Sequence, residues 1–234
     1  MFATGGGSDL PSKRNVNVKW IFSTSLRRAQ MNGIHPKALP NDGSIRLVIA
    51  CRQEERKGTG VVIEALPSIL CAFPKAKLDV IGDGSMLTGL RRRAAELGVA
   101  GSINFHGKVE HLEVLKLLSI GHLFCYPTTA SEGFPKVVLE ALAAGMPVIT
   151  TRVSVLPQLI SNGCGFLLDS ASPGELSTMV IRLCSDETKF MDMSKIAIEV
   201  SKKFCLEDWR DLIGKTLCEA WDVNTLSAEV DFVN

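Results

Sequence analysis

From residue 45 onward, hydrophobic and polar positions alternate in blocks that predict strands and helices in turn. Short apolar runs such as "IRLVIA" predict strands, at residues 45–50, 77–82, 103–107, 122–127, 147–151 and 165–169. Longer stretches predict helices, near residues 58–72, 85–97, 110–120, 135–144 and after 169. Strands separated by helical stretches of roughly 10 to 15 residues indicate βαβ units. We therefore predict an α/β fold with a single parallel sheet and helices on both faces.

The pattern divides the chain into three parts. Residues 1–44 predict a flexible N-terminal segment and linker, because they begin with a glycine run and end in the turn-forming stretch "NGIHPKALPNDGS", with only a short strand-like run between. Residues 45–205 hold the alternating block. Residues 206–234 predict a long helix followed by a frayed tail, and five large apolar side chains lie along one side of this helix: Trp209, Leu212, Ile213, Leu217 and Trp221.

After Lys136, the helix predicted at 135–144 has apolar residues all round except for one carboxylate. Pro135 suits the first helical position, and Gly145 closes the helix before Pro147. A helix without a polar face is expected to be buried on most sides, and Glu140 with it. An unpartnered buried carboxylate costs several kcal/mol, so Glu140 is expected to accept hydrogen bonds from the protein or from a ligand.

Three polar loops follow predicted strands, with the sequences "CRQEERKG", "GDGS" and "TTASEGFP". The carboxyl ends of parallel strands lie at one edge of the sheet, where open α/β sheets bind ligands. In the first loop, Arg52 and Lys57 could neutralise a diphosphate. The alternative is a solvated loop in which Glu54 and Glu55 pair with the cations, and the sequence leaves both open.

The third loop leads into the helix that carries Glu140. Backbone N–H groups at this helix start, from Gly133 and Phe134 onward, can hold phosphate or sugar oxygens. Glu132 could border the same cleft as Glu140, eight positions further on, or could be an ordinary first-turn acid.

Two weaker signals concern other strand ends. The "IGDGS" stretch lacks the third glycine of a dinucleotide fingerprint, which disfavours an NAD site. Backbone groups of Gly107, Lys108 and Val109 could meet the edge of a base, although an ordinary strand end explains them equally well.

Composition excludes several classes of function. With 26 basic and 25 acidic residues, the chain has no general attraction to nucleic acid or membranes. Seven cysteines without a C-x-x-C pair predict reduced thiols of a cytoplasmic protein. Four histidines are scattered singly, so no metal site is predicted. No apolar run reaches about 18 residues, and no signal peptide or membrane span is predicted.

Together these residues resemble the donor-binding half of retaining glycosyltransferases of family 4, "glycosyl transferases group 1", which contain two Rossmann domains. The resemblance rests on Arg52 with Lys57-Gly58, "LDVIGDGS", "INFHGKV" and "SEGFPKVVLEALAAGMPVIT", in the family's order across residues 45–169. The last motif is the most specific, because it carries the E-x7-E pair Glu132 and Glu140. The resemblance implies a single Rossmann-like sheet, one half of a two-domain enzyme.

The resemblance also implies a role for each residue. Arg52 and Lys57 would hold the donor diphosphate and, with Glu132, serve catalysis. The transferred sugar would lie on Glu132 and on the backbone of Gly133, Phe134, Pro135 and Lys136. Glu140 would bind the ribose, and Gly107, Lys108 and Val109 the base. The donor would be a nucleotide-diphosphate sugar, transferred with retention and without cofactor or metal, by positioning and by stabilisation of the departing phosphate. One departure is Cys51, where the family usually has Gly, so this loop is expected to sit slightly differently.

A larger departure is that the family's N-terminal domain does not fit into residues 1–44. We expect an excised donor domain or half of a split enzyme, inactive alone, whose partner is an acceptor domain or subunit. Any peripheral membrane contact would come through that missing domain. Alternatives are a non-enzymatic nucleotide-sugar-binding subunit and a non-hydrolysing nucleotide-sugar epimerase. A glycoside hydrolase would also use two carboxylates, but it would not need the cations.

Overall fold

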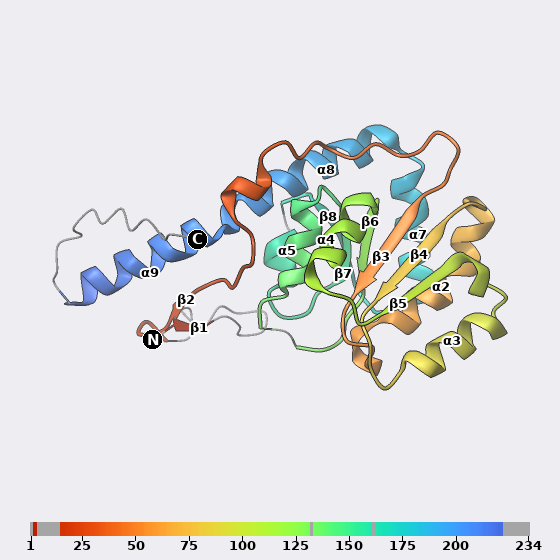
Figure 1. The fold of residues 1–234 in the computed structure, drawn as a ribbon, viewed down its shortest axis with the longest axis horizontal. Helices are drawn as coiled ribbons and strands as arrows, with labels where there is room; N and C mark the ends of the chain where they lie inside the picture. Colours follow the sequence, from red (N-terminus) through yellow and green to blue (C-terminus); the bar gives the residue numbers. More distant parts are fainter. Residues whose placement is uncertain (1, 4–14, 132, 161, 222–234) are drawn as a thin grey trace.

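A computed structural model describes residues 2–3, 15–131, 133–160 and 162–221 (Figure 1). Its centre is a six-stranded sheet with the order β5-β4-β3-β6-β7-β8, in which every neighbouring pair is parallel. The strands are β3 (Arg46–Ala50), β4 (Lys77–Ile81), β5 (Ile103–Gly107), β6 (Leu123–Tyr126), β7 (Val148–Thr151) and β8 (Gly165–Leu168). All six were predicted within two residues, and the predicted fold class is confirmed.

Helices cover both faces of the sheet. The chain runs outward from β3 to β5 through α2 (Thr59–Ala72) and α3 (Leu87–Glu96), and α7 (Pro173–Cys184) packs against α2. After β5 it returns past β3, so α4 (His111–Ile120) and α5 (Lys136–Ala143) cover the opposite face (Figure 1). The short helix α6 (Leu156–Ile160) packs against β7 and β8, and α8 (Glu187–Ser201) packs against α5.

Two of these helices, α6 and α8, were not predicted. Helix α8 could have been predicted from two features of the sequence. Asp186 is an N-cap residue that accepts a hydrogen bond from the Lys189 N–H. Apolar residues follow at helical spacing and are buried, namely Phe190, Met193 and Ala197. Helix α6 has only five residues, which is too short for a periodic pattern. Single 3-10 turns connect the larger elements: η1 (Arg28–Met31), η2 (Glu55–Lys57), η3 (Ala100–Ser102) and η4 (Lys202–Phe204).

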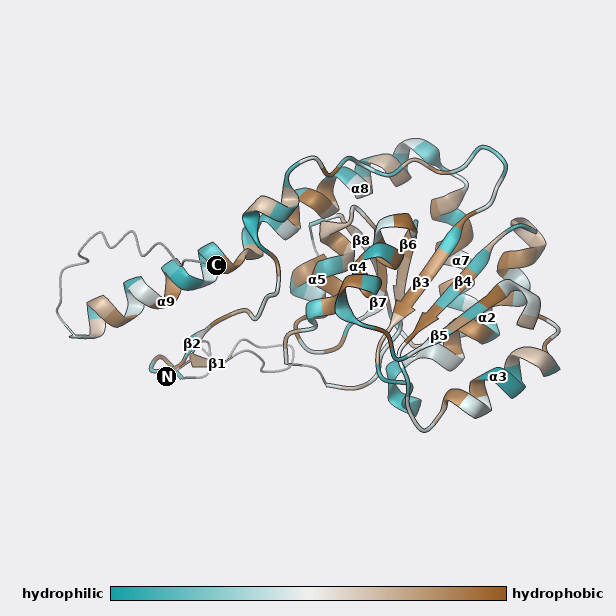
Figure 2. Cartoon of the chain, viewed as in Figure 1, coloured by the Kyte–Doolittle hydropathy of each residue, from teal (hydrophilic) through white to brown (hydrophobic). Residues whose placement is uncertain are grey.

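The hydrophobic core lies on both faces of the sheet. The strands are largely hydrophobic in Figure 2, and Leu47, Val48 and Ile49 are all fully buried. Consecutive residues are buried because helices cover both sheet faces, which explains why the strands appear as continuous apolar runs. All seven cysteines are free thiols, of which Cys125, Cys164 and Cys184 lie in the core and Cys71 is exposed. Burial raises the pKa of Cys164 to about 11 and that of Cys184 to about 12.

The segment before β3 is not a free linker over its whole length. Leu26 and Met31 are buried in a small cluster with Leu139 of α5 and Ile198 of α8. Phe22 packs edge-on against Phe204, with ring centroids 5.1 Å apart. Upstream, β1 (Phe2–Ala3) and β2 (Lys19–Trp20) form a two-stranded parallel sheet. The rest of the predicted flexible start, residues 4–14, lies outside the described part of the chain. The division of the chain at residues 44 and 205 stays a prediction.

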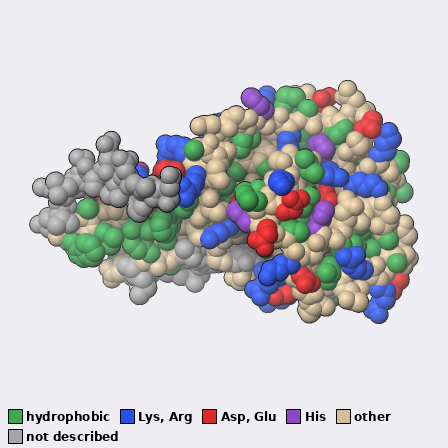
Figure 3. All heavy atoms as spheres, in the orientation of Figure 1, with side chains coloured by type: hydrophobic (Ala, Val, Ile, Leu, Met, Phe, Trp, Pro, Cys, Tyr) green, Lys and Arg blue, Asp and Glu red, His purple; other side chains and the backbone are tan. Residues whose placement is uncertain are grey.

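Helix α9 (Leu206–Trp221) projects from the body of the molecule (Figure 1). None of its residues is buried, and hydrophobic side chains gather on the projecting arm (Figure 3). Trp209 is 37% exposed and Trp221 69% exposed, so both tryptophans lie partly uncovered. The predicted tail after residue 223 lies outside the described residues. Within the described ranges, no helix has the length and apolar character of a membrane span.

Candidate functional site

A cavity of about 550 Å³ lies at the carboxyl ends of the strands. The strand order reverses beside β3, whose neighbours are β4 and β6, and the connections leave β3 and β6 in opposite directions. Such a switch point separates loops on the two sides and opens a crevice between them. The lining residues come from the ends of β3 and β4, from the loops after β3, β4 and β5, and from α4 and α5. They are Ala50, Cys51, Arg52, Ile81, Gly82, Asp83, Lys108, Val109, His111, Val114, Lys136, Val137 and Glu140.

The loops after β3 and β4 are joined backbone to backbone. The N–H of Gln53 donates to the Asp83 carbonyl, and the N–H of Met86 donates to the Gln53 carbonyl, each at 2.9 Å. Gly82 has φ 109°, and a Cβ there would overlap the Cys51 carbonyl. The "GDGS" glycines therefore allow two loops to pack closely. Gln53, which sequence reasoning missed, is fully buried, and its Nε2 donates to the carbonyls of Cys51 and Ile81 at 3.0 Å.

The two predicted diphosphate ligands lie in different surroundings. Arg52 lines the cavity, its side chain is 79% exposed, and its Nη1 lies 3.3 Å from Oε1 of Glu54. The sequence left open whether Arg52 faces a ligand site or pairs with an acidic neighbour. In the structure its side chain does both. Lys57 ends η2, is half-buried, and is not among the described residues that line the cavity. Its role at a diphosphate stays a prediction.

The start of α5 differs in detail from the prediction. Helix α5 begins at Lys136, with Pro135 as its N-cap, one residue later than expected. Lys136 lines the cavity, whereas Gly133, Phe134 and Pro135 are not among its described lining residues. The Phe134 ring packs against Phe204 at 5.8 Å between centroids, so its side chain is structural. Glu132, the most specific prediction, lies outside the described residues.

The predicted base-binding stretch borders the same cavity. Gly107 ends β5 with φ 67°, and its carbonyl accepts a hydrogen bond of 2.8 Å from the Gly82 N–H. Lys108 and Val109 follow directly and line the cavity. The structure thus brings together five predicted residues around one space: Arg52, Lys108, Val109, Lys136 and Glu140.

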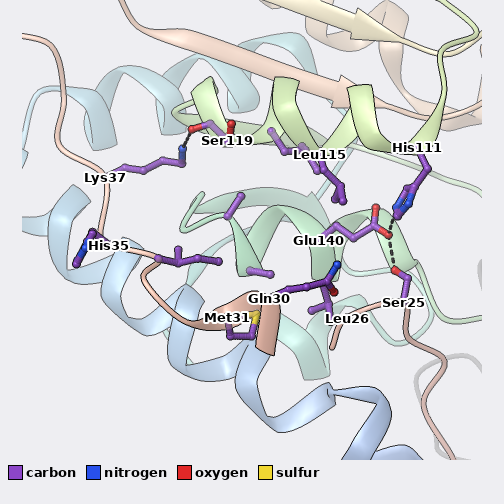
Figure 4. Close-up of a pocket in the computed structure, with 14 residues that line it drawn as sticks. Ser25, Leu26, Gln30, Met31, His35, Lys37, His111, Leu115, Ser119 and Glu140 are labelled. Carbon is purple, nitrogen blue, oxygen red and sulfur yellow. Dashed lines mark hydrogen bonds and ion pairs between the residues drawn. The ribbon is translucent and has the colours of Figure 1, made fainter. Parts of the chain in front are cut away.

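Glu140 is buried, as its apolar helix predicted, with 6% of the residue exposed. Two protein groups hold the same oxygen, Oε1: the Ser25 hydroxyl donates to it, and His111 Nε2 lies 2.9 Å from it (Figure 4). The carboxylate therefore has protein partners before any ligand is considered. Neither partner was predicted. The only sequence signal for His111 was its place at the start of the helix after the "GKVE" strand end.

Glu140 also borders a second cavity of about 360 Å³ between α4, α5 and the N-terminal segment (Figure 4). Its walls are mostly apolar, with polar groups at the two ends. At the end away from Glu140, the Lys37 ammonium donates to the Ser119 carbonyl at 2.5 Å, and burial lowers the pKa of Lys37 to about 8. In the described part of the chain, no group of three or more His, Cys, Asp or Glu side chains is arranged to hold a metal ion.

Comparisons with known proteins place this geometry in a family. A family model described as "Glycosyl transferases group 1" matches residues 31–200. Among curated proteins, the chain is 31% identical over 147 residues to the GDP-mannose-dependent monoacylated alpha-(1-6)-phosphatidylinositol monomannoside mannosyltransferase of Corynebacterium glutamicum. This match covers 59% of the chain and 38% of that relative, so the chain spans well under half of the relative's length.

Solved structures share the fold. Anabaena Alr3699/HepE, solved in complex with UDP and glucose, superposes with a TM-score of 0.71 at 21% identity, over 86% of this chain and 56% of that one. The C-terminal domain of the glycosyl transferase group 1 family protein LpcC from Francisella tularensis gives a TM-score of 0.62 at 21% identity, over 78% of this chain and 94% of that one. The family model matches most of the chain. This protein, with its six-stranded sheet and its cavity at the switch point, therefore belongs to the glycosyl transferases group 1 family.

Proposed function

We propose that this chain is the donor-binding part of a hexosyltransferase and that the 550 Å³ cavity holds a nucleotide-diphosphate sugar. The observation that carries the proposal is the charge pattern of the cavity wall. Three cations, Arg52, Lys108 and Lys136, line it together with two carboxylates, those of Asp83 and of the buried Glu140. Cations fit a diphosphate, and a carboxylate fits the two hydroxyls of a ribose.

The relatives support this choice of ligand. The mannosyltransferase of Corynebacterium glutamicum is named as GDP-mannose-dependent, and the Anabaena structure contains UDP and glucose. These names differ in base and sugar, so both UDP and GDP are tested below. We propose that the base lies against Lys108 and Val109, because they border the cavity at the end of β5.

In the proposed reaction, the bond between the sugar's anomeric carbon and the diphosphate oxygen breaks, and the diphosphate leaves with the electron pair. The acceptor oxygen forms its new bond on the same face of the sugar, and its proton passes to the departing diphosphate oxygen. Arg52 and Lys136 would stabilise the negative charge that develops on the leaving group, and Lys57 and Glu132 keep their predicted roles at the diphosphate and the sugar. We propose that the step needs neither metal nor cofactor, and that the acceptor is bound by a domain or subunit outside this chain.

The test is calorimetric titration of the chain with UDP, GDP, ADP and their glucose or mannose esters. Arg52→Ala and Lys136→Ala should each weaken nucleotide binding by about 1.5 to 3 kcal/mol, the range for hydrogen bonds to charged groups. Arg92→Ala is the matched control, because Arg92 is an exposed cation on α3 whose partner is Glu96. No binding by the parent chain, or equal binding by all three variants, would refute the proposal.

A second candidate is a nucleotide-sugar-binding subunit of a split glycosyltransferase. The match to the curated relative covers 38% of that relative's length, and this candidate assigns acceptor binding to a separate chain. Sugar transfer that occurs only after a separate acceptor-domain protein is added would support this candidate.

A further inference from the structure

The described part of the N-terminal segment reaches the candidate donor site through the hydroxyl of Ser25. Ser25 lies between two anchored neighbours: Thr24 and Leu26 are both buried, and the N–H of Leu26 donates to Oγ1 of Thr24 at 3.1 Å. The Leu26 carbonyl accepts a hydrogen bond of 2.8 Å from the N–H of Leu206. Packing and backbone hydrogen bonds therefore determine where the Ser25 hydroxyl points, which is onto Glu140 (Figure 4).

Both donors to Glu140 use the same carboxylate oxygen. Ser25 Oγ and His111 Nε2 approach Oε1 from different elements, the N-terminal segment and the start of α4. An ionised carboxylate only accepts hydrogen bonds, so Nε2 of His111 carries the proton. The other oxygen, Oε2, makes no hydrogen bond with any described residue, and Glu140 lines the 550 Å³ cavity.

We propose that Ser25 and His111 are positioning residues that fix Oε1 of Glu140 so that Oε2 is presented to the ribose diol of the donor nucleotide. This inference rests on the proposed function. A Glu side chain has several rotamers, and two hydrogen bonds to one oxygen restrict them before the ligand arrives. The segment around Ser25 thereby becomes part of the donor site, although it lies in the sequence far from every motif that predicted that site.

The opposite role is that Ser25 occupies the place of a ribose hydroxyl and must move away. The two roles predict opposite changes when the hydroxyl is removed. A positioning hydroxyl strengthens nucleotide binding, so its loss weakens binding. A hydroxyl that blocks the ribose weakens nucleotide binding, so its loss strengthens binding.

The experiment titrates the full chain with UDP and GDP and with their 2′,3′-dideoxy counterparts, which lack the diol. Ser25→Ala and His111→Phe should each weaken binding of the ribonucleotide that the parent prefers by about tenfold. Both should leave binding of the dideoxy counterpart within about twofold of the parent. Ser25→Thr keeps the hydroxyl and should restore ribonucleotide binding.

Ser119→Ala is the matched control, because Ser119 lines the neighbouring cavity and its hydroxyl donates to the Lys116 carbonyl rather than to Glu140. It should bind both nucleotides like the parent. Dependence on the diol separates positioning from a general loss of structure, which would weaken ribonucleotide and dideoxynucleotide alike.

The outcomes separate this inference from the proposed function. The positioning role is overturned if the Ser25→Ala variant binds the ribonucleotide as tightly as the parent or more tightly. It is also overturned if this variant binds the ribonucleotide and the dideoxynucleotide more weakly by the same factor. If Arg52→Ala loses binding as expected in the same series, the donor site stands without the Ser25 inference. A parent chain that binds none of UDP, GDP and ADP overturns both.

Discussion

At the scale of single residues, the two carboxylates of the E-x7-E pair differ in what they can touch. Glu140 is buried beside the cavity and already has two protein partners, whereas Glu132 lies outside the described residues. Their predicted ligands differ too, since one would grip the ribose and the other the transferred sugar. Mutation of each should therefore affect different ligands.

Glu140→Ala should weaken both the free nucleotide and the nucleotide sugar by about 1.5 to 3 kcal/mol, because both ligands carry the ribose. Glu132→Ala should weaken only the nucleotide sugar. Titration of both variants with both ligands measures this, and thermal melts report stability alongside. Variants that melt earlier but bind both ligands like the parent would show that the pair is architectural.

His122 gives a prediction about pH. Burial, together with the nearby charges of Lys37 and Arg46, lowers the pKa of His122 from 6.5 to about 4. Its Nδ1 accepts a hydrogen bond of 3.0 Å from the Arg46 N–H, which only the unprotonated nitrogen can do. Between pH 6.5 and 4 the unfolded chain therefore binds more protons at this site than the folded chain, so stability falls as the pH falls through that window.

The expected loss from His122 is up to about 3 kcal/mol of unfolding free energy, since each pKa unit corresponds to about 1.4 kcal/mol. Urea unfolding at pH 7, 5.5 and 4.5 measures it. His122→Asn should show a smaller loss over the same range, and His35→Asn, at an exposed position, should follow the parent. Parallel pH profiles for His122→Asn and the parent would contradict the assignment.

At the scale of elements, the helix start of α2 depends on a glycine. Gly58 is the N-cap of α2 with φ 87°, a backbone conformation that L side chains rarely adopt. A Cβ at Gly58 would also overlap the carbonyl of Pro127, the first residue after β6. The glycine therefore lets the loop that carries Arg52 and Lys57 pack against the loop that leads to α5.

Gly58→Ala should cost at least about 2 kcal/mol of unfolding free energy, because strain and overlap with backbone atoms add. Gly214→Ala is the matched control: Gly214 lies inside α9, an added Cβ meets nothing within 4 Å, and helix propensity favours Ala by about 1 kcal/mol. Chemical denaturation of both variants measures the contrast. Equal stability of the two would show that the Gly58 turn adapts without cost.

At the scale of the whole molecule, three aromatic rings join segments that are far apart in the sequence. Phe22, Phe134 and Phe204 come from the N-terminal segment, the loop before α5 and the turn before α9, with centroids 5.1 to 6.2 Å apart. This cluster, defined by these three rings, keeps the N-terminal segment against the α/β body beside Ser25.

Phe22→Ala should lower the unfolding free energy by about 3 kcal/mol, the lower end for a buried Phe truncated to Ala. It should also weaken nucleotide binding, because Ser25 would lose its anchored neighbourhood. Val16→Ala, at a position 90% exposed, is the control and should change neither. Chemical denaturation and nucleotide titration measure both effects. A destabilised Phe22→Ala that binds nucleotide like the parent would separate the cluster from the site.

The sheet and most of its helices could be predicted because local patterns carry them. Leu47, Val48 and Ile49 form a continuous apolar run, and such a run between helical stretches has few interpretations other than a parallel strand covered on both faces. Arg52, Lys108 and Lys136 could be placed near one another because each follows a strand end directly or opens the helix after it. For these residues, position in the chain implies position at the edge of the sheet.

The sequence by itself determined the fold class, the burial of Glu140 and two of the three polar loops that were expected at the ligand site, those after β3 and β4. Each of these depends on contacts within a βαβ unit or on the edge shared by parallel strands. Tertiary structure alone decided which groups hold Glu140. Ser25 lies 115 positions away from it and His111 lies 29. Side-chain hydrogen bonds between distant segments leave no periodic trace in a sequence. They depend on how the N-terminal segment packs across α5 and α8, a packing set by shape and burial rather than by local pattern.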